Sequence, residues 1–305
     1  TKTDQDRRIF LNAIGPVWDG NEVWLVIVAG GSLAGFPPVY ATLLSGFYNL
    51  IMIFLCGLIF RAVAIEFRSK QTSLLWRKAW DMTFSLASFL IGFILGLGLG
   101  NLIQGVPLDQ EGNFIGSFSL FFRPYPILIG LFTTTLFIMH GSIYLAMKTE
   151  GVLHERLRIW VKLSIFLFVI IYFITTFSTW MFMPHMVERI QEYRWLSLVP
   201  VAALLAILNV PRLFSLKKDF QAFLFSCLGI ILMLVVFGIG TFPNLVRSLV
   251  QPDLLSLNFL NASGSELNLT VLLIIVAIGL PFVFCYSAMI YRVFRGKVKI
   301  EASSY

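Results

Sequence analysis

The chain has 305 residues, of which 58% are hydrophobic and only 13% are charged. Soluble domains carry about 25% charged residues, so this composition excludes a soluble globular protein and indicates a polytopic membrane protein. The net charge of +7 would suit a nucleic-acid partner, but the placement of the basic residues, described below, argues against one. The three cysteines lie inside hydrophobic segments and predict neither a disulfide framework nor a metal site.

Runs of about 20 apolar residues predict transmembrane helices. Eight such runs follow one another and predict an all-α, polytopic fold in a single membrane domain, 1–305. The predicted helices are 9–36, 40–62, 80–104, 124–147, 159–183, 195–211, 220–247 and 269–292. Pro37 and Pro38 are expected to end the first of them, since neither can donate a backbone hydrogen bond.

The loops between these helices alternate in charge. If the chain begins on the cytoplasmic side, all but four of its 23 lysines and arginines lie on that side, as the positive-inside rule requires. The four exceptions are Arg123, Arg189, Arg194 and Arg247. Both ends of the sequence are then cytoplasmic, and the basic charge reflects membrane topology. The two longer outer loops, 104–122 and 250–268, are expected to pack as a lid or against a partner.

The first predicted helix contains the segment Gly15-Pro16-Val17-Trp18-Asp19-Gly20-Asn21-Glu22-Val23-Trp24. A charged side chain at bilayer depth costs about 2.5–3.5 kcal/mol on insertion scales, so two acids here need a functional or structural reason. Asp19 and Glu22 are three residues apart and share a helical face. Asp19 would stand about ten residues, or about 15 Å, into the helix. With no lysine or arginine in the segment, we favour a proton-conducting or ion-binding site over a polar contact between helices.

Other residues of this segment have weaker assignments. Trp18 lies four residues before Glu22 and would orient it, and Asn21 adds a hydrogen-bonding group. Pro16 breaks a backbone hydrogen bond and would open room for water. Trp24 would lie deeper and face lipid, a partner or a path for gas, although ordinary aromatic packing is the simpler interpretation.

His140 lies inside the fourth predicted helix. Imidazole is a common haem ligand, but bis-histidine ligation needs two intramembrane histidines, and His154 and His185 lie near the membrane surfaces. We therefore expect no haem ligand and no metal site in this chain.

Three glycines recur at four-residue spacing in the third predicted helix. Such a smooth face permits two helices to approach closely. The sequence therefore predicts a tight helix contact at Gly92, Gly96 and Gly100.

The segment 15–24 resembles the signature of subunit II of the cytochrome bd-type quinol oxidases. Further matches follow in the expected order and extend the resemblance over almost the whole chain. They are Ser45-Gly46-Phe47-Tyr48, Phe60-Arg61 with Glu66-Phe67-Arg68-Ser69-Lys70, Gly141-Ser142-Ile143-Tyr144-Leu145, Lys148-Thr149-Glu150-Gly151 with Leu153-His154, and Ala262-Ser263 with Leu267-Asn268-Leu269-Thr270.

The resemblance implies two four-helix bundles plus one helix, nine in all, in a heterodimer with a pseudo-symmetric subunit I. Subunit I would hold the quinol site, two haems b and one haem d, and this chain none. The complex would oxidise quinol and reduce O2 to water in the bacterial cytoplasmic membrane. Small single-helix subunits and a structural quinone occur in some members. Trp18 and Asp19 would line a proton path and Trp24 an oxygen path.

The family's first helix has no counterpart before residue 9, and residues 1–10 resemble the cytoplasmic loop that follows it. The bundles would then cover about 9–147, without that helix, and about 154–292. We expect Asp19 to carry protons, Glu22 to be a second carrier, and their neutralising partner to lie outside this chain. Two alternatives are a proton-coupled secondary transporter built on the same acids and a purely structural membrane scaffold.

Overall fold

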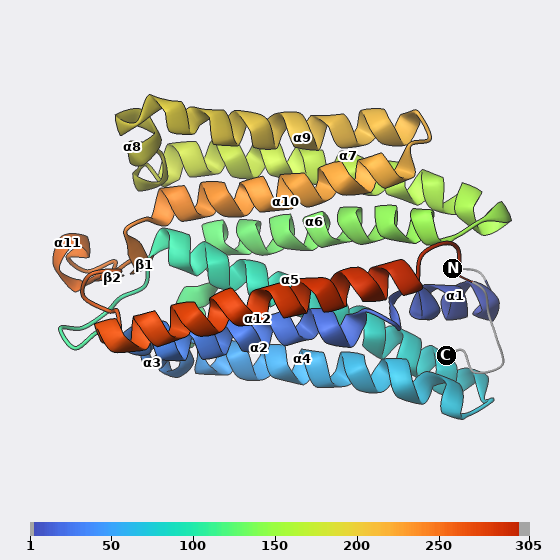
Figure 1. Ribbon diagram of the computed structural model, residues 1–305, viewed down its shortest axis with the longest axis horizontal. Helices are drawn as coiled ribbons and strands as arrows, with labels where there is room; N and C mark the ends of the chain where they lie inside the picture. The colour runs from blue at the N-terminus through green and yellow to red at the C-terminus, as the bar shows by residue number, and fades with distance from the viewer. Residues whose placement is uncertain (1–2, 299–305) are drawn as a thin grey trace. The chain divides into compact units, whose positions relative to one another are not determined.

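The computed structural model describes residues 3–298 and is almost entirely helical (Figure 1). The long helices are α2 (Trp18–Gly35), α4 (Tyr48–Phe67), α5 (Leu74–Gln104), α6 (Pro124–Lys148), α7 (Gly151–Phe182), α9 (Leu198–Ser215), α10 (Asp219–Thr241) and α12 (Glu266–Val293). The shorter ones are α1 (Asp4–Ile14), α3 (Pro37–Gly46), α8 (His185–Glu192) and α11 (Pro252–Leu255), with 3-10 turns η1 (Arg68–Lys70), η2 (Phe118–Phe122) and η3 (Arg194–Ser197). Strands β1 (Asn244–Val246) and β2 (Leu257–Asn258) form one antiparallel pair.

Seven helical segments are long and apolar enough to cross a membrane within the described residues. They are Tyr48–Lys70, Leu74–Gln104, Pro124–Lys148, Gly151–Phe182, Arg194–Ser215, Asp219–Thr241 and Glu266–Val293. The prediction of an all-α polytopic membrane protein is thereby confirmed. Helix α2 is not among the seven because Asp19, Asn21 and Glu22 make its first turns polar. The predicted number of eight stays a prediction.

The first predicted helix, 9–36, is two helices in the structure. Pro16 has no N–H to donate and crowds the preceding turn, so α1 ends at Ile14 and α2 begins at Trp18. A turn in which Val17 donates its N–H to the Ile14 carbonyl joins them. The expected depth of Asp19 is therefore wrong, because Asp19 is the second residue of α2 rather than about the tenth of one long helix.

Other predicted helices have different limits, and those predicted over 80–104 and 159–183 begin earlier, at Leu74 and Gly151. The helix predicted over 40–62 is formed by α3 and α4. Pro37 and Pro38 begin α3, because the first N–H groups of a helix have no partner within the helix and proline loses nothing there. The helix predicted over 195–211 continues through Pro211 to Ser215 as α9. The helix predicted over 220–247 ends at Thr241, and β1 follows it.

The described chain divides into two compact units. The first contains residues up to Ser88, Val106–Gly116 and residues from Asn244 onward, and the second contains Phe89–Gly105 and Ser117–Pro243. The sequence placed the division of the bundles between about 147 and 154, whereas here α12 joins the amino-terminal helices. That the chain acts as one membrane domain, 1–305, stays a prediction.

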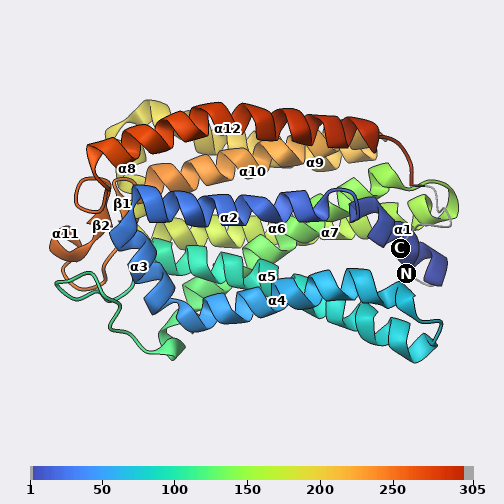
Figure 2. The same ribbon diagram turned by 60° about the horizontal axis from the view of Figure 1, so that its bottom comes forward.

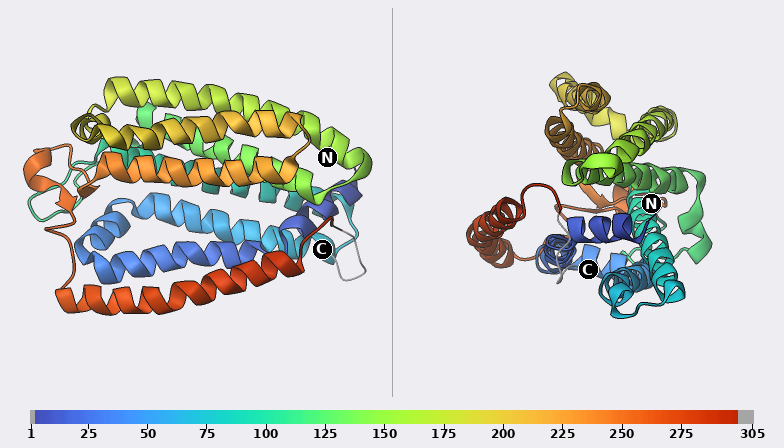
Figure 3. Two further views of the ribbon diagram at one scale, coloured as in Figure 1. Left: turned by 45° about the horizontal axis from the view of Figure 1, so that its top comes forward. Right: turned by 90° about the vertical axis from the view of Figure 1, so that its right-hand side faces the viewer.

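In the first unit, α12 lies beside α2 (Figures 1 and 3). The two helices are tied at their outer ends, where Gly264 donates its backbone N–H to the Gly35 carbonyl at 2.8 Å. The outer segments also pack on one another, because Val106 donates to the Arg247 carbonyl and the Thr42 hydroxyl donates to the Gly112 carbonyl. Parts of the two outer segments therefore pack on one another within this unit, and their role as a lid or as a partner contact stays a prediction.

In the second unit, α9 and α10 lie side by side (Figures 2 and 3), and α6 packs against α7 and α10. Its core contains fully buried Ile143, Val161, Phe168 and Val210. The glycine face of α5 meets α6, since a Cβ atom on Gly96 would lie 2.6 Å from the Ile129 carbonyl oxygen. The close helix contact predicted from the three glycines is confirmed.

Candidate functional site

The two acids of the 15–24 segment lie at the start of α2, one turn apart, as their spacing predicted. Their surroundings differ. Asp19 is exposed and makes no hydrogen bond or ion pair with any described residue, whereas Glu22 and Trp18 are half-buried. Of the two carboxylates, Asp19 is the one available to water, lipid or another chain.

Glu22 forms an ion pair with Arg61 of α4. Their side chains are 24% and 21% exposed, so the pair is partly shielded from solvent. The Arg61 guanidinium also lies over the ring of Phe84 on α5, 5.8 Å from its centroid, a cation–π distance. The expectation that the neutralising partner lies outside this chain is therefore wrong for Glu22. Sequence reasoning missed this pair because it counted Arg61, at the very end of the helix predicted over 40–62, with the basic residues of the cytoplasmic side.

Helix α12 forms another side of this site. Phe284 packs against Trp24, with ring centroids 5.9 Å apart and planes tilted by 40°. Asn21 points its side-chain amide at the Tyr291 hydroxyl, with 3.5 Å between the heavy atoms, the outer limit of a hydrogen bond. The ring of Trp24 thus has a neighbour within its own chain, which sequence reasoning did not foresee because 260 residues separate the two rings.

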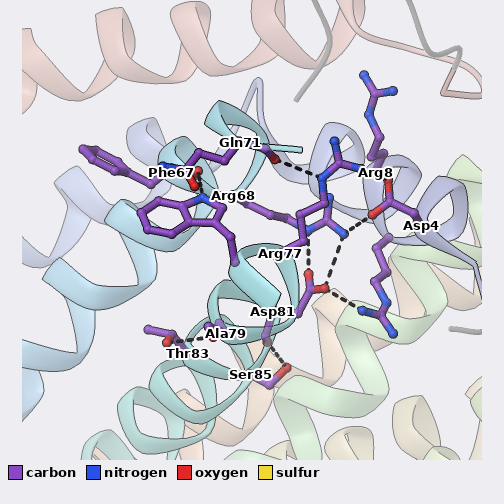
Figure 4. A network of polar contacts seen from close by, with 12 residues as sticks. Asp4, Arg8, Phe67, Arg68, Gln71, Arg77, Ala79, Asp81, Thr83 and Ser85 are labelled. Atoms are coloured by element: carbon purple, nitrogen blue, oxygen red, sulfur yellow. Dashed lines mark hydrogen bonds and ion pairs between the residues drawn. The ribbon is translucent and has the colours of Figure 1, made fainter. Parts of the chain in front are cut away.

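A second group of charges lies at the end of α4 nearest α1, and we call it the Arg68 cluster (Figure 4). Arg68 is only 1% exposed and donates from Nε to Asp81 Oδ1 of α5 and from Nη2 to Asp4 Oδ1 of α1, both at 2.6 Å. Arg77 donates to Asp4 Oδ2 at 2.9 Å, and Arg7 donates to Asp81 Oδ2 at 2.6 Å. The cluster therefore joins α1 to both α4 and α5.

The pKa of Asp4 responds to this cluster. Partial burial raises the pKa of the Asp4 carboxyl, but the hydrogen bond from Arg68 and the charges of Arg68, Arg77 and Arg8 lower it further, so its pKa falls below the ordinary value. A carboxyl with a lowered pKa stabilises the fold above its ordinary pKa and loses that contribution as the pH falls through the lowered value. The contribution of Asp4 to the attachment of α1 is therefore lost in acid.

The three histidines are engaged within the second unit. His140 Nδ1 lies 2.8 Å from Ser226 Oγ, His154 Nδ1 lies 3.0 Å from the Ala146 carbonyl, and His185 Nε2 lies 2.9 Å from the Ile103 carbonyl. Since Ser226 donates its hydroxyl proton to the Phe223 carbonyl, His140 donates from Nδ1. Within residues 3–298 no three His, Cys, Asp or Glu side chains are grouped to hold a metal ion.

Comparison with known proteins adds to this description. Residues 1–294 match the family described as cytochrome bd terminal oxidase subunit II. The chain is 34% identical to cytochrome bd ubiquinol oxidase subunit 2 of Bacillus subtilis (strain 168), over 96% of this chain and 86% of that protein. It is 30% identical to cytochrome bd-I ubiquinol oxidase subunit 2 of Escherichia coli (strain K12), over 98% and 87%. It is 28% identical to a probable cytochrome oxidase subunit 2 of Haemophilus influenzae, over 97% and 86%.

These matches cover nearly the whole of this chain and most of each relative, so they include the start of α2, the Glu22–Arg61 pair and α12 together. The segment 15–24, singled out by its two acids, lies inside the matched region. The chain therefore belongs to the cytochrome bd terminal oxidase subunit II family.

Proposed function

We propose that this subunit of the quinol-oxidising terminal oxidase carries protons from the cytoplasmic side toward haems held by subunit I, with Asp19 as the proton carrier. One observation supports this role above the others. Asp19 is exposed at the start of an apolar helix and has no partner among the described residues. A carboxylate at a membrane-embedded surface is costly unless water or another protein covers it. A partner subunit placed over Asp19 would supply that cover and receive the proton.

The exposed apolar surface of the first unit supports an interface with subunit I. Helix α12 has no buried residue, and in α2 only Gly35 is buried. Lipid and the partner subunit are the surroundings that suit such helices. Trp24, beside Phe284, would line an oxygen path next to this interface.

Haem belongs to the complex, because the family is a cytochrome bd oxidase. The finer assignment extends the resemblance: two haems b and one haem d in subunit I and none in this chain. Small single-helix subunits and a structural quinone are further components that the resemblance suggests. The complex would lie in the bacterial cytoplasmic membrane with the carboxyl terminus of this chain inside. Family membership argues against both the transporter and the purely structural scaffold.

The test is Asp19→Asn in the purified complex with subunit I. We expect quinol-linked oxygen consumption and proton uptake to fall about tenfold or more, since removing a group that transfers protons typically costs at least that factor. The visible spectrum, including the red band of haem d, should be unchanged. The matched control is Asp253→Asn, which neutralises an exposed acid in α11. Unchanged oxygen consumption and proton uptake in Asp19→Asn would show that Asp19 carries no protons.

A further inference from the structure

Two arginines of the α4 segment lie on the same side of the helix. Arg61 and Arg68 are seven residues apart, and η1 continues directly from α4 with Arg68 in helical conformation. Seven residues make nearly two turns, so the two side chains leave the helix in similar directions, separated by about 10 Å of helical rise. Each of them binds an acid from the amino-terminal segment of the chain.

In the first of these contacts the arginine itself is buried, while its two acids are partly exposed. Arg68 reaches Asp4 of α1 and Asp81 of α5 through two of its three nitrogens, and its third, Nη1, is buried without a hydrogen-bond partner in the described chain. A buried guanidinium needs anions close by, because an unpaired charge in this environment is strongly destabilising. The Arg68 charge therefore requires Asp4 and Asp81 at their present positions. Because Asp4 belongs to α1, this requirement also fixes the position of α1.

The second contact repeats this arrangement two turns away. Arg61 binds Glu22 of α2, and its guanidinium lies over Phe84 of α5. Phe84 follows Asp81 by three residues and shares its side of α5. In both contacts, the continuous α4–η1 segment supplies the arginine, α5 supplies the support behind it, and the amino-terminal segment supplies an acid.

We propose that Arg61 and Arg68 form a two-point clamp that fixes α1 and the start of α2, and that Glu22 is an anchor of this clamp instead of a second proton carrier. The inference rests on the proposed role of Asp19. The clamp holds the chain at Asp4 and Glu22, on either side of the turn at Pro16 and of Asp19. In this proposal Arg61 and Arg68 are structural anchors of the fold and take no part in proton transfer.

The chemistry of the pair supports this division of roles. A proton carrier gains and loses a proton in each cycle. Protonating Glu22 would remove the anion from Arg61 and release the start of α2 each time. Protonating Asp19 would break no contact of this kind, since Asp19 makes no hydrogen bond or ion pair with the described residues. One carboxylate therefore holds the helix and the other is free to exchange protons.

The test removes the two charges of the second contact separately and together in the complex with subunit I. Glu22→Gln and Arg61→Met should each reduce the yield of haem-containing complex about threefold or more, because each leaves one unpaired charge. The double variant Glu22→Gln/Arg61→Met should recover the yield to within about twofold, because no unpaired charge remains. Its oxygen consumption per complex and its pH profile should match the parent protein. Lys70→Met, which removes an exposed cation of η1, should behave like the parent in every assay.

Two results would overturn the clamp. One is a double variant that assembles but consumes oxygen about tenfold more slowly, as expected if Glu22 transfers protons. The other result comes from Arg61→Lys, which keeps the cation and is used if the double variant fails to assemble. The clamp predicts that the pH profile of oxygen consumption is unchanged in Arg61→Lys. A shift of that profile by about one pH unit or more contradicts the clamp. Asp19→Asn separates the two ideas. If Asp19→Asn still consumes oxygen at the parent rate, the proposed function is wrong. If Asp19→Asn is inactive and the double variant is slow, only the clamp is wrong.

Discussion

Individual charged residues in this chain are held by contacts that a count of charges does not reveal. Arg68 contributes one of many cytoplasmic cations to the topology, yet its side chain is 1% exposed and lies between two aspartates. Its three-way contact joins residues 4, 68 and 81. Sequence reasoning could identify the acids of α2 as unusual but could not pair Glu22 with Arg61, because pairing depends on which helices are neighbours.

The Arg68 cluster leads to a prediction about stability. Asp81→Asn keeps the shape of the side chain but leaves Arg68 without one of its two anions. Breaking a buried ion pair from one side costs about 3–5 kcal/mol, so we expect a clear loss of stability. Thermal unfolding of the purified complex, followed by loss of the haem spectrum, measures it. Asp253→Asn should leave the transition in place, and an equal, small effect of both variants would argue against a structural role for the cluster.

At the scale of helices, the apolar runs predicted the long helices, although several ends differ, by as many as eight residues at the start of α7. The failures have local causes. Pro16 divides the first predicted helix into α1 and α2, and Phe47 separates α3 from α4. In contrast, Pro211 lies inside α9 without ending it. Whether a proline ends a helix or only perturbs it depends on the packing around it, which the sequence does not state.

The contact between α5 and α6 leads to a second stability prediction. A methyl group on Gly96 would lie 2.5 Å from Thr133 Oγ1 and 2.6 Å from the Ile129 carbonyl oxygen, so α6 would have to move. Gly96→Ala should therefore destabilise the protein by about 1–3 kcal/mol, the usual range for overpacking.

The matched control lies two residues away on the same helix. A Cβ atom on Gly98 meets nothing within 4 Å, so Gly98→Ala should lose no stability and should gain up to about 1 kcal/mol, because alanine is the better helix former. Thermal unfolding of both variants in the same detergent provides the comparison. Equal losses in the two would mean that alanine acts on α5 itself and that the contact with α6 is not tight.

At the scale of the whole molecule, composition alone assigned the protein to the membrane, and the segment 15–24 led to its family. Two features were beyond the sequence. The association of α12 with α2 joins residues more than 230 positions apart, and the pairing of the outer segments 106–116 and 244–258 depends on that same long-range closure. Both features arise because the last part of the chain packs against the first part. Local sequence patterns carry no information about such long-range packing.

The distribution of lysine and arginine predicts the orientation of the protein in the membrane. After replacement of its three cysteines, Ser69→Cys in η1 should be protected from a membrane-impermeant maleimide in intact cells, and Leu260→Cys should be labelled. Both positions are exposed, Leu260 by 91%. In disrupted cells both should be labelled, which controls for access. Labelling of Ser69→Cys in intact cells would reverse the topology.

The break at Pro16 also determines where water can bind. Every helix begins with backbone N–H groups that have no acceptor within the helix, and Val17 offers no side chain to cap those of α2. Because α2 begins at Trp18, these polar N–H groups lie in the turn that contains Asp19 instead of about ten residues before it. They can donate hydrogen bonds to water beside the carboxylate, so a single proline places free backbone donors next to the residue that we propose to exchange protons.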